Sequence, residues 1–85
     1  MNFVAEIKVM PLKELLDPQG KAVLGGLANL GIKNVTDVRI GRHIHLNIEA
    51  SSAEEAKLIA EEASQKLLAN PVMEEFQIQI SQLTD

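Results

Sequence analysis

Residues 38–50 read Val38-Arg39-Ile40-Gly41-Arg42-His43-Ile44-His45-Leu46-Asn47-Ile48-Glu49-Ala50, and apolar residues occupy the even positions apart from Arg42. Polar residues occupy the odd positions apart from Gly41, and this period of two is typical of β-structure with one apolar face. A three-residue turn through 41–43 predicts a hairpin that pairs Ile40 with Ile44. A single long strand kinked at Gly41 keeps the same parity. We favour the hairpin.

Two further strands are predicted near the ends of the chain. Apolar residues occupy every odd position from 3 to 9, and Pro11 closes that segment. Apolar residues also occupy every even position from 76 to 80. Both segments have the period of a strand that buries one face.

Two helices are predicted between the strands, each with an apolar stripe. The first begins after Asp17, whose carboxylate can accept from free backbone N–H groups, and ends at Gly31. The second begins after Ser52 and ends at Asn70-Pro71, because the residue before a proline avoids helical geometry.

Gly25 and Gly26 lie inside the first predicted helix. Each glycine there costs roughly 1 kcal/mol relative to alanine. We interpret the pair as a sign that another backbone approaches this helix closely.

The predicted order of elements is β-α-β-β-α-β. Because each helix and each strand has one apolar face, we expect an α+β fold. It would be a two-layer sandwich with an antiparallel sheet and both helices on one face of it. This arrangement is related to the ferredoxin-like fold. A chain of 85 residues has room for a single domain, residues 1–85.

The composition excludes several classes of function. Eight Lys and Arg against 12 Asp and Glu give a net charge of -4, so we expect no binding to nucleic acid or to a membrane surface. The two Phe are too few for base stacking. Without cysteine, disulfide and thiolate chemistry is excluded. The start of the chain has no signal-sequence pattern, and we expect a cytoplasmic protein.

His43 and His45 share one face of the predicted strand, so both could contact one metal ion. A metal site needs further ligands, and Asn47 and Glu49 continue the same face. We favour two solvent-facing histidines. The expectation is therefore no metal site and no cofactor bound by this chain.

The search for catalytic motifs leads to the same result. Gly20-Lys21 is similar to the end of a phosphate-binding loop, but Leu15 and Ala22 stand where that loop needs Gly and Ser or Thr. No Ser or Thr stands in a nucleophile setting, and paired glutamates are expected on solvated faces. We expect no catalytic residues.

The charges are unevenly distributed along the chain. Arg39, Arg42 and the two histidines cluster around the predicted turn, whereas residues 51–85 contain two basic and seven acidic groups. Complementary patches of this kind suit self-association or docking onto a larger protein.

Three blocks of the sequence resemble the signature blocks of the PurS family. They are Leu16-Asp17-Pro18-Gln19-Gly20-Lys21-Ala22, Asp37-Val38-Arg39-Ile40-Gly41-Arg42 and Leu67-Leu68-Ala69-Asn70-Pro71-Val72. They occur in the right order, and the resemblance covers essentially the whole chain at the family's length. PurS is the small subunit of phosphoribosylformylglycinamidine synthase, so the resemblance implies a PurS-like α+β fold.

The resemblance also implies a role in de novo purine synthesis. In the step catalysed by phosphoribosylformylglycinamidine synthase, ammonia from glutamine is joined to formylglycinamide ribonucleotide in an ATP-dependent ligation. A large synthetase subunit (PurL-like) uses ATP and magnesium, and a glutaminase subunit (PurQ-like) releases the ammonia. The chain is then expected to be a non-catalytic accessory subunit of a C–N ligase. It would form a homo-oligomer, a dimer or tetramer, and bridge the other two subunits.

The same blocks supply the residues expected at interfaces with partners. They are Asp17, Pro18, Gln19, Gly20, Lys21, Arg39, Gly41, Arg42, Asn70 and Pro71. The first five begin a helix, where free N–H groups and a cation are presented. The next three form a basic turn that can bind carboxylates or carbonyls, and the last two set a rigid corner.

Two other functions compete with this interpretation. A small ferredoxin-like regulatory module would bind a metabolite at a dimer interface. An RNA-binding sandwich would need aromatic residues on its central strands, where this sequence has Ile, Val, His and Asn.

Overall fold

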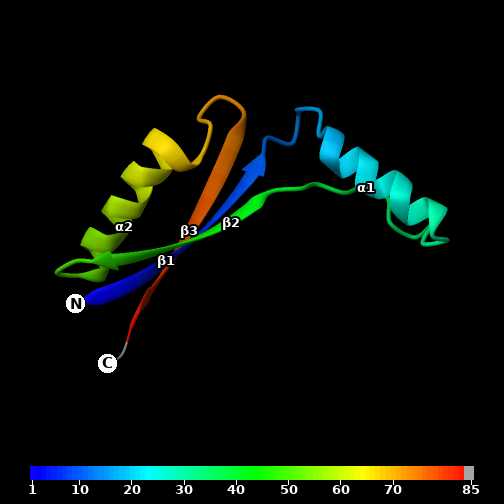
Figure 1. Ribbon diagram of the computed structural model, residues 1–85. Coiled ribbons are helices and arrows are strands. Elements are labelled where there is room, and N and C mark those ends of the chain that lie inside the picture. Colours follow the sequence, from blue (N-terminus) through cyan, green and yellow to red (C-terminus); the bar gives the residue numbers. More distant parts are fainter. Residues whose placement is uncertain (84–85) are drawn as a thin grey trace.

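The computed structural model describes residues 1–83, which form an antiparallel sheet and two separate helical regions (Figure 1). In chain order the elements are β1 (Asn2–Pro11), α1 (Pro18–Asn29), β2 (Arg42–Glu49), α2 (Ala53–Ala63), η1 (Ser64–Leu68) and β3 (Glu74–Gln82). The short η1 is a π-helical continuation of α2. Within the described residues no helix combines the length and the apolar character needed to cross a membrane.

The sheet has the order β2-β1-β3, and both outer strands run antiparallel to β1. The odd-numbered residues from 3 to 9 of β1 are buried. Ile7 lies opposite Ile44 of β2 and opposite Ile78 of β3, so an apolar row crosses one face of the sheet. The central position of β1 explains why it contributes more buried apolar residues than any other described element.

Helix α2 covers this apolar face (Figure 1). Ala56 and Ala60 are fully buried, and their small side chains let the helix approach the strands closely. The Ser52 hydroxyl accepts from the Glu55 amide at 3.1 Å, which confirms the predicted start of the helix. The helical region ends at Leu68, just before Asn70, as the sequence predicts.

Helix α1 projects away from the sheet instead of packing on it (Figure 1). The radius of gyration is 16.5 Å, whereas a compact chain of this length is expected near 12 Å. The predicted limits of the helix are confirmed, with Asp17 as cap and Gly31 in a left-handed conformation at φ +85°. The expectation that both helices cover one face is wrong for α1, because the connecting segments 12–17 and 32–41 carry it beyond the end of the sheet.

The predicted hairpin through 41–43 is also wrong. Residues 32–41 form no strand, and Ile44 pairs with Ile7 of β1 and not with Ile40. A Cβ at Gly41 would overlap the Val9 carbonyl oxygen, so the chain here lies directly on the backbone of β1 and continues along it. The α+β class and the antiparallel sheet are confirmed, with one strand fewer than expected.

Candidate functional site

Three segments far apart in the sequence meet at the end of the sheet from which α1 projects (Figure 1). They are residues 11–20, 38–42 and 68–74, and we call this region the junction. Hydrogen bonds join the first segment to the second and the second to the third. Each segment overlaps one of the three sequence blocks described above, so the fold brings all three blocks together.

Asp17 connects the start of α1 to residues 38–40, the segment in which the chain returns from α1 to the sheet. One carboxylate oxygen accepts from the Gly20 amide at 3.0 Å, and the other accepts from the Ile40 amide at 2.8 Å. The hydrogen bond from Gly20, followed by the one from Ile40, lowers the pKa of the Asp17 carboxyl below its usual value. Asp17 is therefore held as a carboxylate that caps the helix and anchors residue 40.

Gly20 is buried at the first turn of α1. A Cβ at this position would overlap the Val38 carbonyl oxygen and would crowd the Asp17 carboxylate. The absence of a side chain therefore lets the start of the helix rest directly on the returning backbone.

Arg39 ties the returning chain to the end of β1. Its guanidinium Nη2 donates to the carbonyl oxygen of Pro11. The predicted basic turn is thus only partly free to bind partners, because this arginine is engaged within its own chain.

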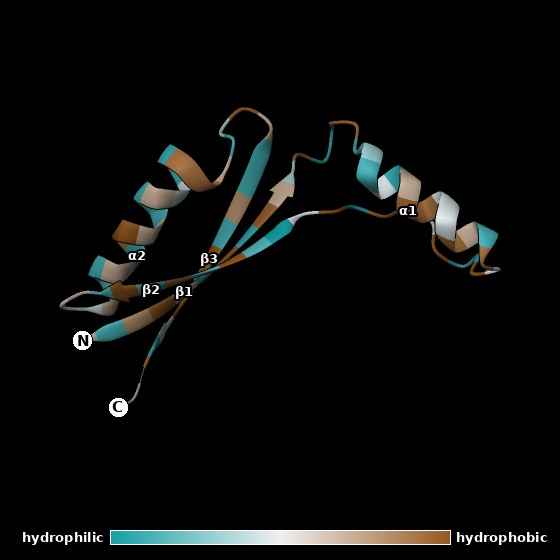
Figure 2. Cartoon of the chain, in the orientation of Figure 1, coloured by the Kyte–Doolittle hydropathy of each residue, from teal (hydrophilic) through white to brown (hydrophobic). Residues whose placement is uncertain are grey.

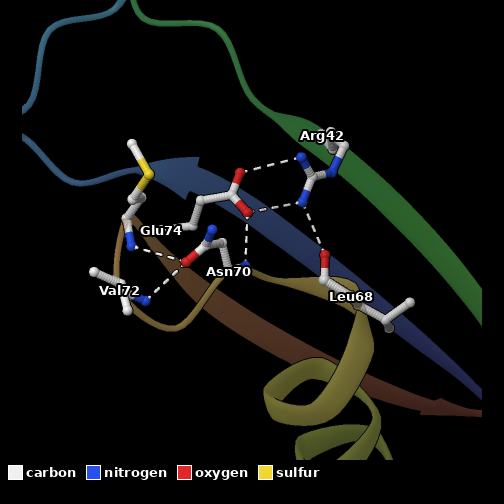
Figure 3. Close-up of polar contacts among 6 residues, drawn as sticks. Arg42, Leu68, Asn70, Val72 and Glu74 are labelled. Carbon is white, nitrogen blue, oxygen red and sulfur yellow. Dashed lines mark hydrogen bonds and ion pairs between the residues drawn. The ribbon is translucent and has the colours of Figure 1, made fainter.

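Arg42 joins β2 to β3 and to the end of η1 (Figure 3). Its Nη1 and Nη2 donate to the two carboxylate oxygens of Glu74 at 3.1 and 3.0 Å. Nη2 also donates to the Leu68 carbonyl oxygen at 2.8 Å. Such bidentate pairing fixes the orientation of the planar guanidinium.

Asn70 and Glu74 hold the corner between η1 and β3 (Figure 3). The backbone N–H of Asn70 donates to the Glu74 carboxylate at 2.8 Å, and the side-chain oxygen of Asn70 accepts from the backbone N–H of Val72 at 3.0 Å. The Asn70 hydrogen bond, followed by the one from Arg42, lowers the pKa of the Glu74 carboxyl. The corner is therefore stabilised by the Glu74 carboxylate and by an Asx turn that the Asn70 side chain makes with the backbone.

An open hollow of about 460 Å³ lies at the junction. Pro18, Gln19 and Gly41 line it together with Asp17 and Arg42. Lys21 lies just outside the junction and borders a second hollow along α1, with Ile32 and Val35. Pro71 lies within the junction and is exposed at the corner before β3. The structure thus gathers most of the predicted interface residues, but not all of them.

Sequence reasoning missed Glu74 as a partner of the junction. The residue stands 32 positions from Arg42, and nothing in the local pattern connects the two. Glu6 was missed for a related reason. It lies opposite His45 in the pairing of β1 with β2. The predicted hairpin instead paired this part of β2 with the residues just before Gly41, so Glu6 was not expected beside the histidine.

The contacts of the junction are helix caps, an ion pair and bonds to backbone carbonyls. Such contacts shape a surface, whereas catalysis would need a nucleophile or an acid–base pair held against a substrate. The fold and the junction define a class of small α+β protein, with a three-stranded antiparallel sheet covered by one helix and a second helix that projects from its end.

Comparison with known proteins identifies the family. The model of the PurS family, described as phosphoribosylformylglycinamidine (FGAM) synthase, matches residues 4–82. The chain belongs to the PurS family. It is 39% identical over 80 residues to FGAM synthase subunit PurS of Bacillus subtilis, covering 92% of this chain and 94% of the relative. It is 41% identical over 82 residues to that subunit of Synechocystis, covering 96% and 82%.

Solved structures show the same fold. PurS of Thermus thermophilus superposes with a TM-score of 0.85 at 36% identity, covering 99% of this chain and all of the other. A chain in the structure of PurLQS from Thermotoga maritima superposes with a TM-score of 0.88 at 32% identity, covering 95% and 99%. The projecting α1 is therefore part of a shape that this chain shares with its relatives.

Proposed function

We propose that this chain is the PurS subunit of FGAM synthase in purine biosynthesis, an accessory subunit with no catalytic activity of its own. Support comes from the family match over nearly the whole chain. A Methanocaldococcus jannaschii relative is described as one of the subunits of formylglycinamide ribonucleotide amidotransferase in the purine biosynthetic pathway.

The observation that carries this proposal is the exposure of α1. Apolar side chains are exposed on the helix and the segment after it, including Val23, Leu30, Ile32 and Val35. Figure 2 shows hydrophobic bands along this projecting part of the molecule. Burying apolar surface releases about 25 cal/mol per Å², so association with another chain would stabilise this region.

The first partner that we propose for the α1 region is a second copy of the chain. A Cβ added at Gly25 or Gly26 would meet no atom within 4 Å. The close backbone approach that these glycines predict is therefore not made inside one chain. A homo-oligomer, a dimer or tetramer, would supply it.

The junction is assigned to the larger subunits, the PurL-like synthetase and the PurQ-like glutaminase. Pro18, Gln19 and Arg42 line its hollow and would contact these partners. Lys21, just outside the junction, and Pro71, within it, are both exposed and extend the proposed surface.

The remaining candidates act as positioning residues in this proposal. Asp17 and Arg39 hold the two connecting segments together. Gly20 and Gly41 allow the backbones to touch, and Asn70 supports the corner before β3.

The proposed task is to hold two catalytic centres in register. Ammonia released from glutamine must reach formylglycinamide ribonucleotide before it is protonated in bulk water. In this proposal the synthetase subunit uses ATP and magnesium, and this chain binds no cofactor for the reaction. The cytoplasmic location stays a prediction. No observation favours the regulatory metabolite-binding module.

Reconstitution tests this function directly. The purified synthetase and glutaminase would be assayed for glutamine-dependent formation of formylglycinamidine ribonucleotide, with and without this chain. We expect turnover only in the complete mixture, and none with this chain alone. An unrelated acidic protein of similar size is the control for non-specific stabilisation. Turnover that is unchanged when the chain is omitted would contradict the proposal.

A further inference from the structure

Three potential metal ligands meet on the face of the sheet opposite α2. Glu6 of β1 lies directly opposite His45 of β2, and His43 follows two residues away on the same face. The Glu6 Oε1 atom is 3.1 Å from His45 Nε2 and 4.0 Å from His43 Nε2. One ligand atom from each of the three residues lies within 4.8 Å of those from the other two.

These separations suit a single small ion. Ligand atoms about 2.0–2.2 Å from a tetrahedral Zn²⁺ are separated from one another by about 3.4 Å. The observed pairs bracket this value, so side-chain rotation alone can close the site. The sheet fixes the three backbone positions through the β1–β2 register, which leaves little to be ordered on binding.

The chemistry of the three groups is selective. Two imidazoles and one carboxylate are typical ligands of zinc, copper, nickel and iron, whereas magnesium and calcium prefer oxygen ligands alone. Lys8 is a positive charge on this face, directly opposite His43. Its side chain is exposed, so water screens its repulsion of a bound cation.

We propose that Glu6, His43 and His45 form a surface site for one divalent transition-metal ion of the Zn²⁺ type, with water completing its coordination. Bound there, the ion joins the central strand to the edge strand β2 on the polar face of the sheet. The site lies away from the junction and needs no partner subunit.

Calorimetric titration of the full-length, metal-free chain with zinc chloride at pH 7.5 tests the proposal. We expect one Zn²⁺ per chain, with binding weakened at least about tenfold in Glu6→Gln and in His45→Gln, because each loses one of three ligands. Glu75→Gln is the matched control: it makes the same charge change on β3, outside the cluster of three ligands, and it should bind as the original chain does. No binding, or equal binding by all four proteins, would overturn the proposal.

A second measurement reports the ligands themselves. The chain has two histidines and no cysteine, so imidazole resonances in an NMR spectrum can be followed one by one as zinc is added. Both histidines should shift together and saturate at one equivalent. Zinc that shifts neither ring, or only one, overturns the site even if it binds elsewhere. Circular dichroism of each variant shows that the fold is retained.

Discussion

Arg42 and Glu74 form a bidentate ion pair that joins the first residue of β2 to the first residue of β3. These strands are the two edges of the sheet, and β1 runs between them. The pair therefore clamps both edges at the end of the sheet from which α1 projects. Arg42 also binds the Leu68 carbonyl oxygen, so η1 is held by the same guanidinium.

Replacing Arg42 by Ala should lower the free energy of unfolding by about 1 kcal/mol. The change removes a bidentate ion pair and a hydrogen bond to a carbonyl, and exposed pairs of good geometry contribute at this level. Urea unfolding followed by circular dichroism measures the effect. Lys66→Ala is the control, since it breaks an exposed ion pair with Glu62 within one helical region and should change stability less. Equal losses of stability in the two variants would show that the Arg42–Glu74 pair contributes no more than an ordinary exposed ion pair.

Acid should weaken the fold through Asp17 and Glu74. The pKa values of both carboxyls are lowered in the folded state, by hydrogen bonds from Gly20 and Asn70 in the first place. A lowered folded-state pKa stabilises the protein above the unfolded-state values of about 3.8 and 4.5. That stability is lost as the pH falls through them towards the folded-state values.

The acid dependence is measured by urea unfolding between pH 6 and pH 3. The double variant Asp17→Asn, Glu74→Gln should be less stable at pH 6 and should lose less stability on acidification. Glu75→Gln serves as the control, because it removes a neighbouring carboxyl and leaves the pair with Arg42 in place. A double variant with the same slope as the original chain would contradict this account.

Two glycines of α1 should respond to alanine with opposite signs. Gly20→Ala forces a Cβ against the Val38 carbonyl oxygen, and we expect a loss of about 1–3 kcal/mol. Gly25→Ala meets no neighbouring atom of its own chain and should stabilise the helix of the dissociated chain by up to about 1 kcal/mol. Unfolding is compared at a concentration where light scattering shows that both variants are dissociated. Losses of equal size would disprove the close contact at Gly20.

Self-association should depend on the apolar residues of α1 and of its C-terminal end. Leu30, which directly follows α1, is 78% exposed. Replacing it by Lys should raise the dissociation constant of the oligomer about tenfold or more, because burial of a leucine contributes about 1.5–3 kcal/mol. Sedimentation velocity over a range of concentrations measures this. Leu58→Lys is the matched control, at a leucine of α2 that is 65% exposed. If Leu58→Lys has the larger effect, the interface lies on α2.

Binding of the larger subunits should depend on Gln19. This exposed side chain lines the hollow at the junction, and Gln19→Lys should weaken the reconstituted complex while the unfolding curve stays unchanged. Gln65→Lys makes the same change at an exposed position of η1. Co-elution with the synthetase and glutaminase separates the two. A complex that tolerates Gln19→Lys as well as Gln65→Lys would place the interface elsewhere.

Local features were predictable because their physical causes lie within a few residues. Asp17 and Ser52 cap helices through their own side chains, and each bonds an amide three positions later. The alternation over residues 3–9 reports one buried face whatever the partner strand is. The three sequence blocks also predicted the family, and the comparison with known proteins confirmed it.

Pairing was not predictable from the same pattern. Ile44 has the same parity whether it faces Ile40 in a hairpin or Ile7 of a distant strand, so alternation cannot choose between them. The pairing with Ile7 joins residues 37 positions apart, and it became visible only in the register of the sheet. Glu6 and Glu74 were missed as partners of His45 and Arg42 for the same reason.

The amino-acid sequence thus determined both helices with their caps, the two terminal strands, the apolar faces and the family. It could do so because propensity, capping and periodicity act between near neighbours. Tertiary structure was needed to show that α1 leaves the sheet and that Arg42 meets Glu74. Those outcomes depend on long-range contacts, such as a Gly41 backbone lying on Val9, whose energies are set only when distant segments meet.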